Sequence, residues 1–153
     1  MHNAMRTTLA TVLFGVFLWS PLARAQDFAG NYRIEGWNPG SSTSAPADYD
    51  GTALIQIEGQ IEGQIEGQIE GQIEGKIFRF SGMIDGQAYL GKGIAHTKTG
   101  TLALIFASQD SPEQGVTLLV PSAQGFAATW TDFAPNKANQ GGVGQELWTK
   151  IPD

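Results

Sequence analysis

Short runs of alternating apolar and polar residues make up most of the chain after residue 25. An alternation with a period of two is typical of strands with one buried face, and a helical period is nearly absent from this part. The runs are separated by Gly, Pro, Asn and Asp, which favour turns. We therefore expect eight strands, at residues 28–37, 49–57, 76–84, 87–97, 101–107, 115–120, 125–131 and 142–151.

The connections between most of these strands are short, and several have the chemistry of tight turns. Asp85-Gly86 is a two-residue hairpin signal, and Gly100 and Gly125 tolerate a positive φ. Consecutive strands with short connections favour an antiparallel meander, and eight strands can close and so remove their exposed edges. The prediction is an all-β fold, an eight-stranded antiparallel up-and-down barrel, with a two-sheet β-sandwich as the alternative.

Alternation also assigns one face of each strand to the interior. The side chains expected to point inward are Tyr32, Ile34, Ala53, Ile55, Ile57, Phe78, Phe80, Leu102, Leu104, Phe106, Val116, Leu118, Val120, Phe126, Ala128, Trp130, Val143 and Leu147. Gly91-Lys92-Gly93 inside a strand suggests a bulge or a sharp bend, of the kind found at barrel corners.

The first 25 residues follow a different pattern. A short, weakly basic start precedes residues 7–19, an uncharged and largely apolar run that Pro21 ends. Ala23 and Ala25 supply the small residues that precede a cleavage point, and the apolar run is too short to span a bilayer comfortably. The pattern predicts a secretory signal peptide at 1–25; the alternative is a buried helix of the mature domain.

Cleavage before Gln26 would leave a single domain at 26–153, long enough for a hydrophobic core. Its expected location is periplasmic or secreted. Whether the chain starts at Met1 or at Met5 is left open by the sequence.

Residues 57–76 consist of four IEGQ units followed by IEGK. In a strand, Ile and Gly of each unit share one face, while Glu and Gln share the other. One straight strand would run about 66 Å, so we expect an extended hairpin inserted between the second and third strands. The expected register pairs Ile57 with Ile77 and Glu58 with Lys76, because a shift of two in the pairing opposes Glu to Glu and an odd shift opposes Ile to Gln or Glu. Slips of four residues are nearly equivalent in the middle of the tract. The tract is either a surface for adhesion or assembly, or a neutral expansion of a loop.

Charge and composition narrow the classes of partner. The net charge is −6, and it becomes −8 without the leader, which carries two of the nine basic residues and no acid. An acidic chain without a basic cluster argues against nucleic acid and favours a monomer. The absence of Cys excludes disulfides, zinc–thiolate sites and cysteine nucleophiles. After the leader, no apolar run reaches membrane-spanning length.

No arrangement of residues points to catalysis or to a metal. His96 lacks a Gly-x-Ser-x-Gly nucleophile motif, and the sequence from Asp48 departs from a calcium loop at Ala53 and Gly59. Nothing in the sequence selects a pair among four candidate carboxylates, which are Glu35, Asp85, Asp132 and Glu146. We therefore expect a non-enzymatic protein without a cofactor, a catalytic site or a metal site.

The aromatic residues carry the functional expectation. Trp37 precedes the loop at 38–48, Trp130 precedes the loop at 132–142, and such loops gather at the ends of a barrel. The candidate ligand-binding residues are Tyr32, Trp37, Phe80, Phe106 and Trp130. They suit a small apolar molecule or a peptide bound between the strands, or else they only fill the core.

A set of glycine and aromatic positions runs through the domain. It comprises Gly30-x-Tyr32, Gly36-Trp37-Asn38-Pro39, Tyr49-Asp50-Gly51-Thr52, Gly91-x-Gly93 and Gly144-x-Glu146-Leu147. This order resembles a group of small exported bacterial proteins with G-x-Y-x(3)-G-x-N-P near the start, of unassigned function, some of which are labelled fibronectin-binding. The opening is also similar to the G-x-W opening of lipocalin and avidin barrels. The resemblance implies a barrel and a host or envelope protein as a possible partner.

Overall fold

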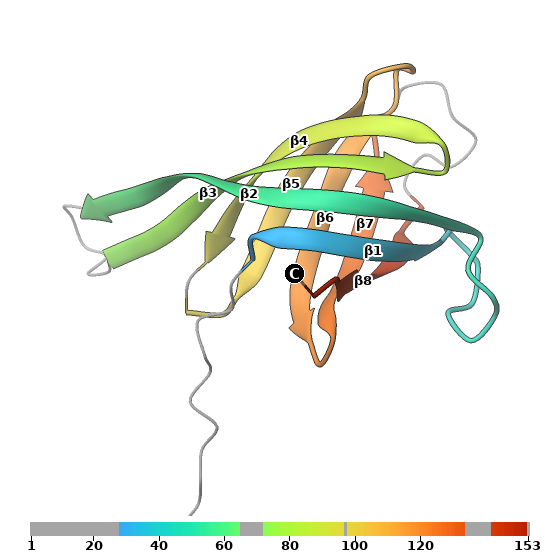
Figure 1. The fold of residues 1–153 in the computed structure, drawn as a ribbon, viewed down its shortest axis with the longest axis horizontal. Coiled ribbons are helices and arrows are strands. Elements are labelled where there is room, and N and C mark those ends of the chain that lie inside the picture. Colours follow the sequence, from blue (N-terminus) through green and yellow to red (C-terminus); the bar gives the residue numbers. More distant parts are fainter. Residues whose placement is uncertain (1–27, 65–71, 97, 134–141, 153) are drawn as a thin grey trace, which may run out of the picture.

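The computed structural model describes residues 28–64, 72–96, 98–133 and 142–152 (Figure 1). Each strand pairs antiparallel with the next, and β8 pairs with β1, so the sheet closes into a barrel. The eight-stranded barrel is thus confirmed over the sandwich. The strands are β1 (Gly30–Trp37), β2 (Tyr49–Gln64), β3 (Gln72–Ile84), β4 (Gln87–His96), β5 (Thr101–Ser108), β6 (Gln114–Ser122), β7 (Gly125–Asp132) and β8 (Gly144–Lys150).

The turns follow the predicted chemistry where they are described. Asp85 and Gly86 have φ of 48° and 73°, as a two-residue hairpin turn between β3 and β4 requires. Gly100 and Gly125 also have positive φ, of 68° and 152°. The predicted leader at 1–25 lies outside the described residues. Within the described part, no helix is long and apolar enough to cross a membrane.

The two ends of the barrel differ. At the base end, where β1 begins, Phe28 precedes the strand and is buried inside the barrel. Its ring stacks on Phe126 with centroids 5.6 Å apart and contacts Phe78 at 5.3 Å. The Tyr32 hydroxyl donates a hydrogen bond to the Phe28 carbonyl oxygen at 2.8 Å. Phe28 therefore closes the base end. The other end, where β1 ends and β2 begins, is here called the mouth end.

The predicted inward face is wrong for β6. Val116, Leu118 and Val120 point outward, and Thr117 and Leu119 are buried instead. Residues opposite each other across a ladder share a face, and β6 lies between two strands whose inward side chains are large. Phe106 of β5 opposes Gly115, and Trp130 of β7 opposes Thr117. The face of β6 that carries Gly115 and Thr117 therefore points inward, because the neighbouring rings occupy the interior at these two positions.

The inward face of β8 was also misassigned. Val143 is exposed and Leu147 is only partly buried, whereas Trp148 is buried and faces Phe126 across the ladder. Leu147 lies opposite Glu35 of β1, on the outer side. Ile57 is exposed as well, since β1 pairs with β2 only as far as Ile55.

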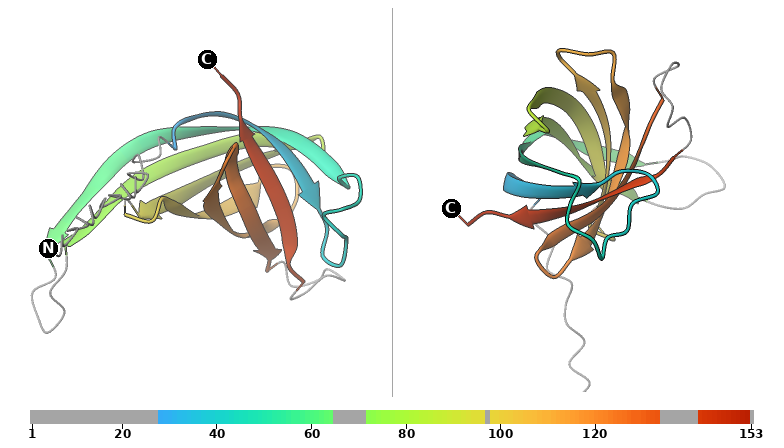
Figure 2. Two further views of the ribbon diagram at one scale, coloured as in Figure 1. Left: turned by 90° about the horizontal axis from the view of Figure 1, so that it is seen from below. Right: turned by 90° about the vertical axis from the view of Figure 1, so that its right-hand side faces the viewer.

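The repeats extend β2 and β3 beyond the barrel as a two-stranded arm (Figure 2). The register differs from the prediction: Gly59 pairs with Ile77 and Gln60 with Lys76. The barrel part of the ladder, where inward Ile55 opposes Phe80, fixes the register from outside the tract. Residues 65–71 of the repeat lie outside the described residues.

A β-bulge, predicted at Gly91-Lys92-Gly93, occurs instead at Glu58; the β4 ladders run through the glycines without a shift. The extra residue places Ile61 opposite Gly75 rather than opposite Glu74, so Ile and Gly keep one face of the arm.

The Glu58 carboxylate lies 2.6 Å from Arg79 and 2.8 Å from Lys92, and these two cations hold its pKa below the usual range, Lys92 most strongly. Glu58 thus ties the bulge to β3 and β4.

Candidate ligand-binding pocket

A pocket of about 120 Å³ lies at the mouth end of the barrel. This volume is space for on the order of ten waters, or for a ligand of comparable size. Of the lining residues within the described part of the chain, six are aromatic, three are acidic, and none is Lys, Arg or His. The lining comprises Asn38, Tyr49, Phe80, Ile84, Asp85, Gln87, Tyr89, Leu104, Phe106, Glu113, Thr117, Trp130, Glu146 and Trp148.

Three of the pocket's rings lie over glycines of the neighbouring strand. Tyr49 opposes Gly36, Phe106 opposes Gly115, and Trp130 opposes Gly144 across their ladders. A Cβ at any of these glycines would collide with the opposing ring. The glycines therefore let the rings lie close to the backbone, as aromatic residues do over glycines in designed sheets.

The acid Glu146 is held by two donors of the lining. Its Oε1 accepts a hydrogen bond from the Tyr49 hydroxyl at 2.9 Å, and its Oε2 accepts one from Trp148 Nε1 at 2.7 Å. Burial raises the pKa of Glu146, and the hydrogen bonds from Trp148 and Tyr49 oppose that rise. The two donors fix the carboxylate's orientation and leave it lone pairs for a further donor.

The phenols around this acid remain protonated at neutral pH. Burial raises the pKa of Tyr49, and the charge of Glu146 adds to the rise. Burial likewise raises the pKa of Tyr89, with Glu113 as the next contribution. Both tyrosines therefore serve as neutral donors or acceptors and not as anions.

The inner wall of the pocket is a set of ring contacts. Phe80 lies 5.7 Å from Trp148, and Tyr89 meets the edge of Phe106 at 5.9 Å, both measured between ring centroids. Trp130 Nε1 is buried within the pocket wall. The inner wall thus offers apolar surface, while Asn38, Gln87, Thr117 and the three acids make the rest of the lining polar.

The five sequence-predicted site residues separate into two groups. Phe80, Phe106 and Trp130 line the pocket. Tyr32 lies in the core beside Phe126, at the base end, and Trp37 donates from Nε1 to the Ala45 carbonyl oxygen at 3.0 Å, in the loop after β1. The structure therefore brings three of the five together and places the other two elsewhere.

Sequence reasoning missed the residues that give the pocket its polarity, Tyr49, Tyr89 and Glu146, together with Trp148. The signal was present in β8, where Gly144, Glu146 and Trp148 alternate with a period of two. An inward Glu breaks the apolar pattern of a buried face. Alternation therefore favours Leu147, and not Glu146, for the interior of the barrel.

The four candidate carboxylates also separate. Asp85 and Glu146 line the pocket. Glu35 is exposed and lies 3.5 Å from Arg33, while Asp132 is buried at the end of β7. His96 contacts Thr99 in the turn after β4. Among the described residues, no group of three or more His, Cys, Asp or Glu is placed to hold a metal ion.

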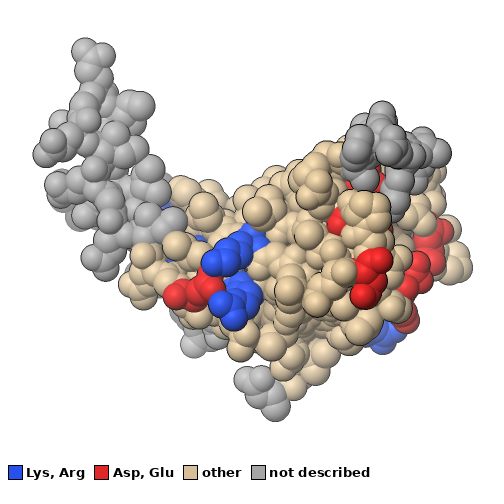
Figure 3. Space-filling model, turned by 90° about the horizontal axis from the view of Figure 1, so that it is seen from above, with Lys and Arg blue, Asp and Glu red and all other residues tan. Residues whose placement is uncertain are grey.

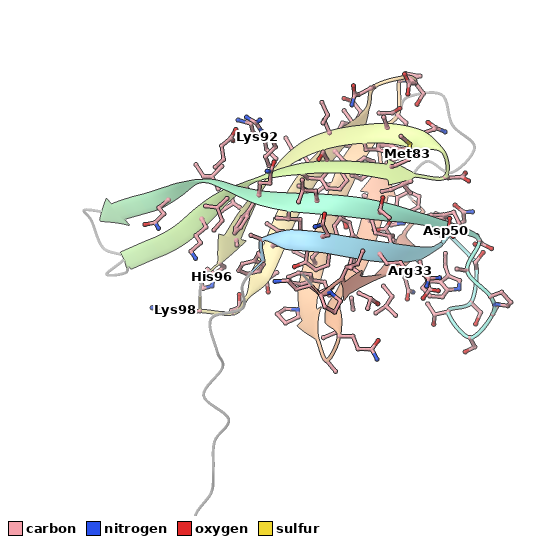
Figure 4. All side chains as sticks on the ribbon, viewed as in Figure 1. Arg33, Asp50, Met83, Lys92, His96 and Lys98 are labelled. Atoms are coloured by element: carbon pink, nitrogen blue, oxygen red, sulfur yellow. The ribbon has the colours of Figure 1, made fainter. Side chains whose placement is uncertain are left out.

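On the face of the barrel that Figure 3 shows, the described Asp and Glu lie mostly toward the mouth end, and the described Lys and Arg lie mostly beside the arm. Figure 4 places Asp50 and Arg33 on the mouth side and Lys92, His96 and Lys98 on the side of the arm.

No protein-family model matches the chain, and no match was found among curated proteins or solved structures.

Proposed function

We propose that this protein is a non-enzymatic binding protein that takes a small, largely apolar ligand into the pocket at the mouth end. The observation that carries this proposal is the pocket itself, which combines six aromatic side chains with a small set of oriented polar groups. Phe28 fills the opposite end of the barrel. The predicted leader supports export, so we further propose that the protein binds its ligand in the periplasm or outside the cell.

Native mass spectrometry of the protein purified from its own host tests this proposal. We expect a retained small molecule that dissociates on activation. Thr117→Leu enlarges an inward residue of the lining and should reduce the retained fraction severalfold. Val116→Leu enlarges the adjacent outward residue and should leave it unchanged. A wild-type protein that carries no small molecule, or equal retention in both variants, would contradict the proposal.

A second candidate is an adhesion or assembly module that acts through the arm, a host or envelope protein being its partner. The observation favouring it is the pairing of the arm. Residues 59–64 pair only with β3, and residues 72–74 pair only with β2. The two strands of the arm therefore each keep one edge unpaired, which a partner strand could join.

Deletion of Gln60 to Glu74 separates this candidate from a passive arm. The deletion joins Gly59 to Gly75 and removes pairs that the barrel does not use. We expect the free energy of unfolding to change by less than about 1 kcal/mol, because the arm buries little apolar surface. If the arm is the contact, light scattering should show salt-promoted association in the full chain only, since salt weakens the repulsion between acidic copies. Association that persists after the deletion would reject the arm.

A further inference from the structure

The lining of the pocket contains three acidic side chains. Glu113 and Glu146 approach it from two sides of the barrel, and Asp85 lies in the turn between β3 and β4. Among the residues that the structure describes, no basic side chain belongs to the lining. A ligand bound there meets the negative charges of these acids.

Glu146 is the acid with the most defined geometry. Two neutral donors hold it, Tyr49 at 2.9 Å and Trp148 at 2.7 Å, so its orientation is set before any ligand arrives. Within the described residues, no Lys or Arg forms an ion pair with it. This part-buried carboxylate lacks a charge partner among the described residues that would offset its desolvation.

The rings of the pocket complete the pattern. Tyr89, Phe106 and Trp130 present π surface to the same small volume as Glu146. Ring faces attract ammonium groups, Trp most strongly, and they also pack against an apolar body. Aromatic walls around an uncompensated carboxylate suit a ligand that is positive at one end and apolar at the other.

We infer that the pocket selects a small organic amine, with its ammonium group hydrogen-bonded to Glu146 and its apolar body against Phe106 and Trp130. This inference rests on the proposed binding function and names its ligand class. The pocket volume limits the part that enters to roughly ten non-hydrogen atoms. Burial raises the pKa of Glu146 in the empty pocket, and a bound ammonium would lower it again.

Three probes of matched size test the charge selectivity: 2-phenylethylamine, the neutral 2-phenylethanol and the anionic phenylacetate. Binding to the full chain is followed by calorimetry and by the fluorescence of Trp130 and Trp148. We expect the amine to bind at least tenfold more tightly than the alcohol, and phenylacetate to bind more weakly still. A lysine blocked at both ends, as a fourth probe, separates a free amine from a lysine side chain of a peptide.

Glu146→Gln removes the charge and keeps the size of the side chain. It should weaken amine binding at least tenfold and change alcohol binding less than twofold. Glu35→Gln removes an equal charge from the outer face of the same barrel and should alter neither. If Glu146→Gln does not fold, the pH dependence of binding to the wild type tests the role of the Glu146 charge instead. Its affinity for the amine should fall as the pH is lowered through the raised pKa of Glu146, while its affinity for the alcohol stays constant.

Equal affinity for amine and alcohol, or amine binding that is unaffected by Glu146→Gln, would overturn the inference and leave the binding function standing. If none of the probes binds, the inference is also overturned, and the proposed function then depends on the retained ligand alone.

Discussion

At the scale of single residues, the position of Glu146 in the β8 ladder determines that its side chain points into the barrel. It lies on the inward face of β8, between Gly144 and Trp148, and opposes Ala128 of β7. An acid on an inward face costs stability when it is ionised, because it leaves water without gaining a cation. Its retention in the interior is what gives the pocket a polar centre.

The pH dependence of stability reports this cost. Because the pKa of Glu146 is raised in the folded state, the folded state binds its proton more tightly than the unfolded state does. The resulting stabilisation is present below the ordinary glutamate pKa and is lost as pH rises through the raised value. Glu146→Gln lacks this contribution. Its free energy of unfolding relative to wild type should therefore increase between pH 4 and pH 7, as measured by urea denaturation. A difference that is constant over this range would contradict the assignment.

At the scale of elements, the face of each strand is set by its neighbours. Val116, Leu118 and Val120 are the more apolar set of β6, so alternation favoured them for the interior. Thr117 faces inward because Trp130 opposes it. Such cross-strand fit depends on residues that are distant in sequence.

Paired substitutions in β6 test this assignment. Leu119 is buried and Leu118 is exposed to 46%. Leu119→Ala should lower the free energy of unfolding by about 2–5 kcal/mol, because it removes buried methyl groups and leaves a cavity. Leu118→Ala should change it by less than about 0.5 kcal/mol, as outer-face substitutions do. Chemical denaturation of both variants measures the difference, and equal losses would reject the orientation.

Most of the fold could be predicted from the sequence, but only part of the candidate site could. Eight strands and the Asp85-Gly86 turn have local signals, namely alternation and turn chemistry. The bulge at Glu58 has none, because it adjusts the repeat to a register set by Ile55 and Phe80 inside the barrel. Phe80, Phe106 and Trp130 are predictable site residues, because alternation places these aromatic side chains on the inward face of their strands. The approach of Tyr49 to Glu146 spans 97 positions in the chain, and only the closed barrel brings them together.

At the scale of the whole molecule, the two ends of the barrel are filled differently. The base end depends on Phe28, which precedes β1 and packs between Phe78 and Phe126. The pocket lies at the opposite end, and its lining shares no residue with this cluster. We therefore expect changes at the base end to affect stability more than the proposed binding at the mouth end, although Tyr32 contacts both Phe126 and the pocket residue Trp148.

Removal of the base plug tests that separation. Phe28→Ala should lower the free energy of unfolding by about 3–5 kcal/mol, as the loss of a buried aromatic ring does. Amine affinity at the mouth end should stay within twofold of wild type at temperatures where the variant is folded. Thermal denaturation and calorimetry supply the two measurements. Loss of affinity in folded Phe28→Ala would show that the two ends are coupled.

The register of the arm allows the number of repeat units to change during evolution. Each repeat unit contains four residues, an even number, so the gain or loss of a whole unit preserves the faces of both strands. Because the bulge at Glu58 already matches the tract to the barrel, a tract of any number of units meets the same anchors. Copying slippage in the underlying DNA could therefore lengthen or shorten the arm, by about 7 Å per unit, without disturbing the barrel. The arm can differ in length between lineages while the pocket stays unchanged.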